Sequence, residues 1–208
     1  MSDIIVLFQG DSVTDACRTY DDPASLGQGY PMMIAASYGS MYPEQYVQFI
    51  NRGVSGDRVI NLQKRWQSDC IELQPDVVSI LIGVNDTWRR YDSNDPTSTE
   101  AFEKVYRDIL TQTREKTDAQ IILMEPFVLP YPEDRIAWRE DLDPRIHVVR
   151  SLAREFEAAL IPLDGIFAQA SARREIEFWA ADGVHPTLAG HALIARAWIE
   201  TVEELGIL

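Results

Sequence analysis

Residues 4–12 read Ile4-Ile5-Val6-Leu7-Phe8-Gln9-Gly10-Asp11-Ser12. A continuous run of five apolar residues is typical of a strand that is covered on both faces of a sheet. The polar group that follows lies where α/β proteins place their reactive side chains, beyond the carboxyl end of a strand. We therefore expect a buried first strand that delivers Ser12 to a functional edge of the sheet.

Four further apolar runs have the character of buried strands: Tyr46–Ile50, Val77–Ile82, Ile121–Met124 and Leu160–Leu163. Between them, apolar residues recur at helical spacing in Glu100–Lys116, in Pro144–Ala159 and in a last segment after Pro186-Thr187. This alternation predicts a five-stranded parallel sheet with helices on both faces, a three-layer α/β/α sandwich. The proline-rich segment Pro126–Arg145 is predicted to be a long loop or lid.

Composition limits the class of protein. With 208 residues, 46% of them hydrophobic, we expect a single domain over residues 1–208. The formal net charge of −14 repels phosphate groups, which excludes nucleic acid and anionic membranes as natural partners. A small neutral or sugar-like substrate suits this charge better than a polyanion.

The same sequence favours the cytoplasm. Cys17 and Cys70 are the only cysteines, and two isolated thiols in a chain of this size suit a reduced protein better than a disulfide. Met1–Asp3 has no basic region, and the apolar run of Ile4–Phe8 is too short for a signal peptide. No apolar stretch approaches the roughly 20 residues of a membrane span.

Polar clusters recur beyond the predicted strands: Asn51–Gly56 after the second, Gly83–Asp86 after the third and Asp182–Pro186 before the last helix. The carboxyl ends of parallel strands share one edge, so these clusters are expected to converge with Ser12. A serine hydroxyl needs a base to act as a nucleophile, and imidazole suits that task near neutral pH. We predict Ser12 as the nucleophile, His185 as its base, and Asp182 as the carboxylate that orients the imidazole.

Acyl transfer also needs donors for an oxyanion. The backbone N–H groups of Ser12 and Gly53 and the side-chain amide of Asn85 are the predicted donors. Asp11 is expected to brace its turn by accepting backbone N–H bonds, and it is also assigned to substrate binding. Asp86 is predicted to brace its loop.

Other candidate residues have simpler explanations. Two ligands, Asp182 and His185, without a third do not make a metal site, and we expect no metal and no cofactor. His147 is predicted to face solvent, and His191 to serve packing or capping. Trp88, one helical turn after Asn85, is the aromatic residue that we expect beside substrate. The remaining aromatics are expected in the core or at subunit contacts, and five Trp and eight Tyr in a small domain favour a homo-oligomer.

Taken together, the motifs resemble those of a known family. Gly10-Asp11-Ser12, Gly53, Gly83-Val84-Asn85-Asp86 and Asp182-Gly183-Val184-His185-Pro186 resemble blocks I, II, III and V of the SGNH/GDSL hydrolases, in the family's order. Further stretches resemble the intracellular bacterial acetylxylan esterases of this superfamily: Gly10–Asp15, Gly27–Tyr30, Lys64–Trp66, Asn85–Arg89 and His185–His191. Each block alone is a weak signal, and their combination in this order is what supports the resemblance.

The resemblance implies a flavodoxin-like fold and the deacetylation of sugars such as xylo-oligosaccharides. It implies the triad Ser12, Asp182 and His185, with an oxyanion hole formed by Ser12, Gly53 and Asn85. Ala181 departs from the family, because these esterases carry a larger aromatic residue there, and this changes the expected shape of the acyl or sugar pocket. Two alternatives are a lysophospholipase, thioesterase or short-chain lipase with the same triad, and a non-catalytic carbohydrate-binding protein on the same fold.

Overall fold

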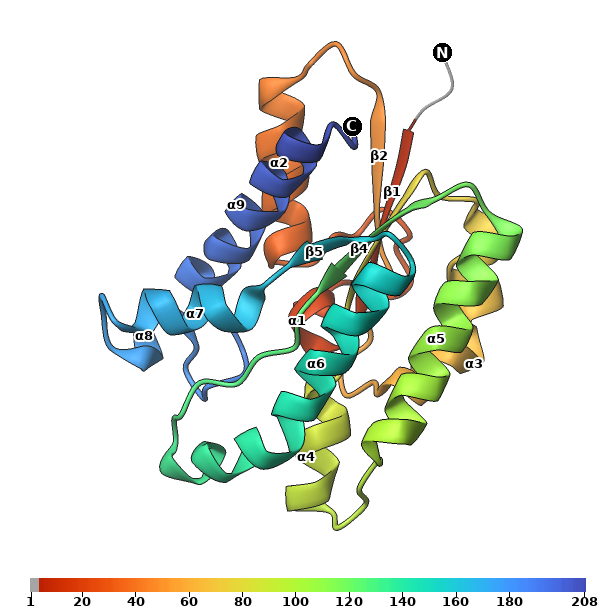
Figure 1. The fold of residues 1–208 in the computed structure, drawn as a ribbon. Helices are drawn as coiled ribbons and strands as arrows, with labels where there is room; N and C mark the ends of the chain where they lie inside the picture. The colour runs from red at the N-terminus through yellow and green to blue at the C-terminus, as the bar shows by residue number, and fades with distance from the viewer. Residues whose placement is uncertain (1–3) are drawn as a thin grey trace.

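A computed structural model describes residues 4–208. Its centre is a five-stranded sheet with all pairings parallel and the spatial order β2-β1-β3-β4-β5 (Figure 1). The strands are β1 (Ile4–Gly10), β2 (Val47–Asn51), β3 (Val77–Leu81), β4 (Gln120–Met124) and β5 (Ala159–Ile161). The predicted parallel sheet is confirmed.

Helices cover both faces of the sheet, which confirms the three-layer α/β/α sandwich (Figure 1). One layer contains α2 (Tyr30–Met41), α7 (Leu163–Ser171), α8 (Ile176–Trp179) and α9 (Leu188–Leu205). The opposite layer contains α3 (Val59–Asp69), α5 (Thr99–Lys116) and α6 (Arg139–Glu155). Short helices α1 (Ser12–Asp15) and α4 (Val84–Asp92) follow β1 and β3, and 3-10 turns η1 and η2 occupy Ile71–Leu73 and Glu133–Trp138.

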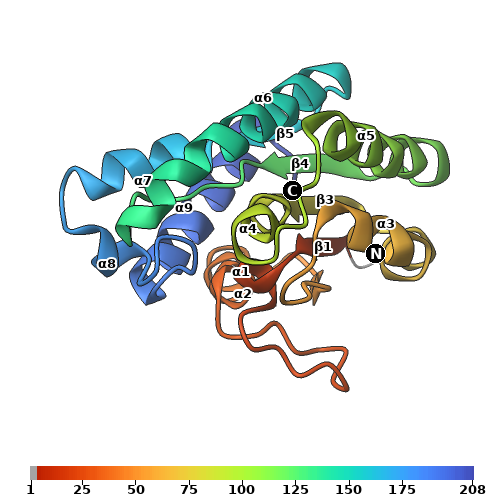
Figure 2. The same ribbon diagram turned by 90° about the horizontal axis from the view of Figure 1, so that it is seen from below.

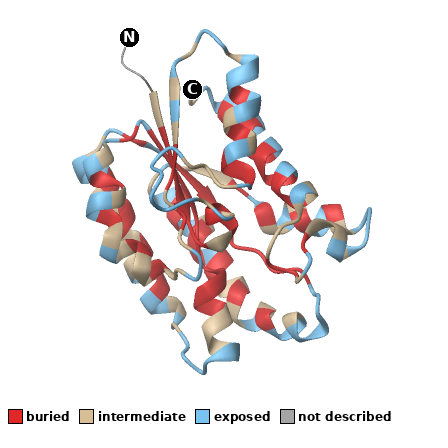
Figure 3. Cartoon of the chain, turned by 180° about the vertical axis from the view of Figure 1, so that it is seen from behind, coloured by how far each residue is buried: buried red, intermediate tan, exposed pale blue. Residues whose placement is uncertain are grey.

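Alternate residues of each strand enter opposite cores. In β1, Val6 and Phe8 pack in the core beneath α2 and α9, whereas Leu7 packs in the core beneath α3 and α5. β3 and β4 alternate in the same way, so the central strands are buried on both faces (Figure 3). This double burial explains why the strands are recognisable as continuous apolar runs.

The segment Pro126–Arg145 differs from the predicted long loop. Residues Glu133–Trp138 form η2, and α6 begins at Arg139, five residues before Pro144. Proline inside a helix removes one backbone donor and is unfavourable by about 3 kcal/mol. Trp138, Leu142 and Ile146 bury their side chains together in a small third core, and this packing holds the helix on both sides of Pro144.

The fifth strand also differs in its bounds. Leu163 was predicted as its last residue but instead begins α7, because Pro162 directly after Ile161 supplies no ladder donor and leads into a helix. The other predicted strands agree within two residues at each end. Met1–Asp3, used in the prediction of the cellular compartment, lie outside the described residues.

Cys17 is exposed and Cys70 is buried, and both are free thiols in the structure. Among residues 4–208, we find no helix whose length and apolar character together would let it cross a membrane.

One polar contact links the last helix to the central strand and makes a prediction about stability. The indole N–H of Trp198 in α9 donates to Ser79 Oγ of β3 at 3.0 Å, and both residues are fully buried. Trp198→Phe leaves the Ser79 hydroxyl without its donor, so we expect the free energy of unfolding to fall by about 1–3 kcal/mol in urea titrations. Adding Ser79→Ala to Trp198→Phe should reduce stability by less than the sum of the two single changes. Unchanged stability of Trp198→Phe would contradict the importance of this contact.

Candidate active site

The predicted reactive residues converge at the carboxyl edge of the sheet. Figure 2 views the molecule from this side, with α1 and α4 near the centre of the view. Ser12 begins α1 directly after β1, and Asn85 lies in the first turn of α4 directly after β3. His185 lies in the loop before α9. Parallel pairing of β1 and β3 brings the first two segments to the same edge.

Ser12, His185 and Asp182 form one hydrogen-bonded line. Ser12 Oγ lies 2.9 Å from His185 Nε2, and His185 Nδ1 lies 2.7 Å from Asp182 Oδ2. The second carboxylate oxygen of Asp182 accepts the backbone N–H groups of Val184 at 3.0 Å and His185 at 2.7 Å. The carboxylate is therefore fixed by its own loop while it orients the ring.

These contacts shift the ionisation of both partners. The hydrogen bond to Asp182 raises the pKa of His185 above its usual value, although partial burial of the ring opposes this. Partial burial of the carboxyl favours its neutral form, yet the bonds from His185 and Val184 outweigh it and hold the pKa of Asp182 well below its usual range. Asp182 is therefore a carboxylate whenever His185 is near its own pKa.

Gly183 lets the loop that carries Asp182 and His185 pack closely on the chain beside it. Its φ is +80°, and a Cβ there would lie 2.1 Å from the carbonyl oxygen of Tyr131. Its own carbonyl accepts the N–H of Leu129 at 2.8 Å. A side chain at this position would push the loop away from the serine.

Two of the three predicted oxyanion donors each have an N–H group that is free to bind a ligand. Within the described chain, no residue accepts a hydrogen bond from the Ser12 N–H. The Asn85 amide donates one N–H to the backbone oxygen of Asp57 at 3.1 Å, which leaves its second N–H for a ligand. Gly53 differs, because its N–H donates to Asn51 Oδ1 at 2.8 Å. Its role as a donor stays a prediction that requires this bond to be shared or released.

Gly53 also allows its loop to approach α1 closely. A Cβ on Gly53 would lie 2.3 Å from the backbone nitrogen of Asp15. Asp15, which the sequence analysis did not single out, holds the same loop: its Oδ2 accepts the hydroxyl of Ser55 at 2.6 Å and the N–H of Ser55 at 3.0 Å. These bonds lower the pKa of Asp15 in spite of its partial burial.

Asp11 braces its turn as predicted, but it does not lie on the substrate surface. Its Oδ1 accepts the N–H of Val13 at 3.0 Å, and only 1% of the residue is exposed. This corrects its assignment to substrate binding, because the carboxyl is buried beneath Ser12. Burial raises the pKa of Asp11 to about 7, although the Val13 bond and the charge of His185 oppose the rise.

Asp86 braces its loop, as predicted. Its Oδ2 accepts the N–H of Val59 at the start of α3 at 3.1 Å, and the residue is fully buried. Burial raises the pKa of Asp86 to about 6, against the effects of this bond and of the Arg145 charge.

A polar cleft of about 300 Å³ opens directly at Ser12. It is lined by Ser12, Ser55, Gly56, Asn85, Trp88, Arg89, Asp92 and His185. Trp88 lines this cleft, with its ring centroid 5.7 Å from that of His185, and its contact with substrate stays a prediction. Arg89 and Asp92, which the sequence analysis missed, form an ion pair with each other within α4. They follow Trp88 by one and four residues, so the helical position of Trp88 was the available signal.

The packing beneath the cleft leaves little space. A cavity of about 10 Å³ has walls formed by Asp11, Val13, Leu81, Ile82, Val84, Pro126, Phe127 and Val184. Asp11, Val13, Val84 and Val184 are each a direct neighbour in sequence of Ser12, Asn85 or His185. A space of this size holds about one water molecule, so the protein is close-packed behind its reactive groups.

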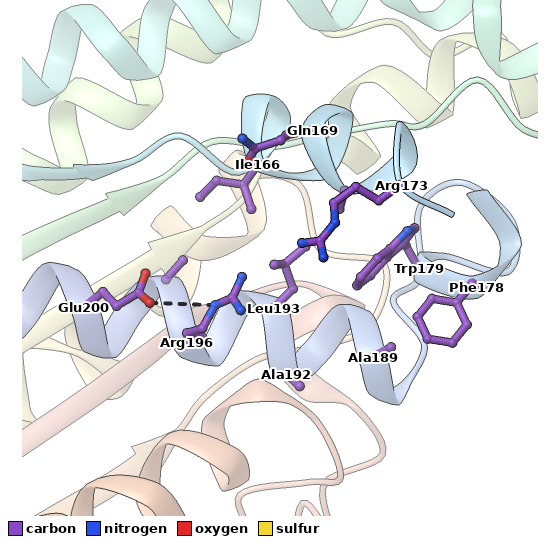
Figure 4. A pocket seen from close by; sticks show the side chains of 12 residues that line it. Ile166, Gln169, Arg173, Phe178, Trp179, Ala189, Ala192, Leu193, Arg196 and Glu200 are labelled. Atoms are coloured by element: carbon purple, nitrogen blue, oxygen red, sulfur yellow. Dashed lines mark ion pairs between the residues drawn. The ribbon is translucent and has the colours of Figure 1, made fainter. Parts of the chain in front are cut away.

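A larger cavity, about 560 Å³, is elsewhere and contains none of the predicted site residues. It lies between α7, α8 and α9, where Arg173, Trp179 and Arg196 surround an apolar floor that includes Leu193 (Figure 4). Volume alone therefore does not identify the reactive site.

The remaining candidate residues do not line the cleft. His147 is exposed on α6, as expected. His191 Nδ1 accepts the N–H of Tyr30 at the start of α2 at 3.2 Å, and burial lowers the pKa of His191 to about 4. Trp66, Trp138 and Trp198 are core residues. Within residues 4–208, no three His, Cys, Asp or Glu side chains are grouped as a metal site would require.

Known proteins are similar to this chain in sequence and in fold. Residues 8–193 match the GDSL-like lipase/acylhydrolase family. The chain is 32% identical over 205 residues to an acetylxylan esterase of Geobacillus stearothermophilus, covering 95% of this chain and 93% of the relative. The structure of Axe2, an acetylxylan esterase from the same organism, matches with a TM-score of 0.88 at 31% identity, over 97% of this chain and 94% of that one. A Parabacteroides merdae protein matches with a TM-score of 0.93 at 34% identity, over 100% and 97% of the two chains.

The family match extends over most of the described chain, and the relative and the solved structures agree with it across nearly its whole length. The chain therefore belongs to the GDSL-like lipase/acylhydrolase family and is an SGNH-type esterase.

Proposed function

We propose that this esterase removes acetyl groups from xylo-oligosaccharides or similar acetylated sugars through an acyl-enzyme on Ser12. The observation that carries the proposal is the hydrogen-bonded line from Ser12 through His185 to Asp182 at the mouth of a polar cleft. The similarity to an acetylxylan esterase supports the choice of substrate class.

The proposed reaction has two halves. Ser12 Oγ attacks the ester carbonyl carbon while its proton passes to His185 Nε2, and the carbonyl oxygen becomes an oxyanion facing the Ser12 N–H and the Asn85 amide. The intermediate collapses, the sugar oxygen leaves with the proton from His185, and the acetyl group stays on Ser12. Water then attacks the acyl-enzyme with His185 again as base, which releases acetate and restores the serine.

The shape of the site favours a short acyl group on a polar alcohol. The cavity of about 10 Å³ behind the reactive residues leaves little room for an acyl chain. The cleft in front offers hydroxyl, guanidinium and carboxylate groups together with the Trp88 ring, which suits hydrogen bonding and stacking with a sugar. A lysophospholipase, thioesterase or short-chain lipase would need an apolar surface for its acyl chain.

Three predictions from the sequence remain part of the proposal: a single domain, a cytoplasmic location and a homo-oligomer.

Ser12→Ala tests the nucleophile. We expect hydrolysis of p-nitrophenyl acetate and of acetylated xylo-oligosaccharides to fall by about 10⁴-fold or more, because the variant lacks the hydroxyl that forms the proposed acyl-enzyme. The melting temperature should stay close to that of the wild type. Substantial turnover by Ser12→Ala would disprove the mechanism, and failure of a fluorophosphonate probe to label the wild type would favour a non-catalytic binding protein.

Asp182→Asn tests the pairing that makes His185 a base. Because the Asp182 hydrogen bond raises the pKa of His185, replacing the carboxylate should lower that pKa, so the imidazole loses its proton at a lower pH. NMR titration of the three histidines would show this shift directly. His191 is the internal control, because burial is the main cause of its low pKa of about 4. An unchanged His185 titration would contradict the pairing.

A panel of p-nitrophenyl esters tests the acyl pocket. We expect kcat/KM for the acetyl ester to exceed that for the octanoyl ester, because each buried methylene gains about 0.8 kcal/mol only where an apolar surface receives it. Acetate release from acetylated xylo-oligosaccharides, followed by chromatography, tests the sugar. Preference for the octanoyl ester would favour the lipase or thioesterase alternative.

A further inference from the structure

Arg65 of α3 connects the end of β1, which leads to Ser12, with Asp57, whose backbone oxygen holds the Asn85 amide. Its Nε lies 2.9 Å from Asp57 Oδ2, and its Nη2 donates to the backbone oxygen of Gly10 at 3.3 Å. Arg65 is not among the residues that line the cleft, so it lies behind the site.

The first connection fixes the end of β1. The Gly10 carbonyl precedes Ser12 by two residues, and besides Arg65 it accepts the N–H of Val54 at 3.1 Å. Arg65 Nη1 also donates to Gln9 Oε1 at 2.9 Å, and Gln9 is fully buried. The guanidinium thus holds both residues that lead into the turn of the nucleophile.

The second connection fixes the Asn85 amide. Asn85 Nδ2 donates to the backbone oxygen of Asp57, whose carboxylate is paired with Arg65. The backbone N–H of Asp57 donates to Val54 at 3.1 Å, which closes a turn between the two connections. The position of the Asp57 carbonyl therefore sets the direction in which the free N–H of Asn85 points.

We propose that Arg65 is a positioning residue, which sets the distance between the Ser12 N–H and the Asn85 amide by holding Gly10 and Asp57 on one guanidinium. The inference rests on the proposed function. Side-chain exposures of 18% for Arg65 and 13% for Asp57 place the pair largely out of water, unlike an ordinary surface ion pair. A planar guanidinium with several fixed donors can hold acceptors at set angles, which a lysine ammonium cannot.

The proposal concerns turnover more than binding. Oxyanion donors act on charge that develops after substrate has bound, and they must lie about 2.7–3.1 Å from the oxygen. Displacement of one donor by about 1 Å is enough to lower the rate by about 10²-fold. A residue that acts only through this distance changes kcat and leaves KM nearly unchanged.

Arg65→Gln is the main test, with p-nitrophenyl acetate as substrate. We expect kcat to fall by about 10- to 100-fold and KM to change by less than about threefold. Arg65→Lys should recover only part of the loss. Lys64→Gln, a loss of the same charge at the exposed neighbour in α3, is the matched control and should leave both constants unchanged.

A double-mutant cycle with Asn85→Ala shows whether Arg65 acts through the amide. If it does, Arg65→Gln should lower kcat by a clearly smaller factor in the Asn85→Ala background than in the wild type. Should Arg65→Gln fail to fold, Asp57→Asn replaces it, because this change removes the ion pair and keeps the backbone carbonyl.

The outcomes separate this role from the proposed function. Equal factors in both backgrounds, an unchanged kcat, or a raised KM at constant kcat would each overturn the positioning role while the wild type remains an esterase. Absence of Ser12-dependent turnover in the wild type would refute the proposed function and, with it, any role for Arg65 in the reaction.

Discussion

The contact between Ser12 Oγ and His185 Nε2 joins residues 173 positions apart and is the interaction on which the site depends. Neither side chain has a local reason to be near the other. Ser12 is placed by β1 and its turn, whereas His185 is placed by a loop that packs on residues 129–131 and enters α9. The parallel sheet makes the meeting possible, because it brings the ends of distant strands to one edge.

Carboxyl groups of three aspartates hold the loops and helix ends around the site in place. Asp11 caps the turn of the nucleophile, Asp86 ties α4 to the start of α3, and Asp15 holds the loop of Gly53. Two of these carboxyl groups, Asp11 and Asp86, have raised pKa values because burial penalises their charge. Such groups destabilise a fold unless they are hydrogen-bonded, and each of these carboxyl groups accepts a backbone N–H or a hydroxyl from a loop or helix end beside the cleft.

Much of this was predictable from the sequence because the signals were local. Strands buried on both faces appear as apolar runs, and the blocks around Ser12, Asn85 and His185 each lie within a few residues of a strand or helix end. What escaped prediction depends on partners far along the chain. The helix around Pro144 forms because Trp138, Leu142 and Ile146 find a common core. The occupied N–H of Gly53 and the burial of Asp11 likewise depend on tertiary neighbours that no spacing rule reveals.

Gly53 and Gly183 are positions at which the site does not tolerate a side chain. At Gly53 and Gly183 a single added carbon would lie within 2.3 Å of backbone atoms of another segment. Backbone cannot move aside as a flexible side chain can, so substitution at either glycine displaces a whole loop and its functional groups. Ala181 stands two residues before Gly183 and is exposed. An exposed side chain can change without displacing a backbone segment, so Ala181 is free of the constraint that applies at Gly183.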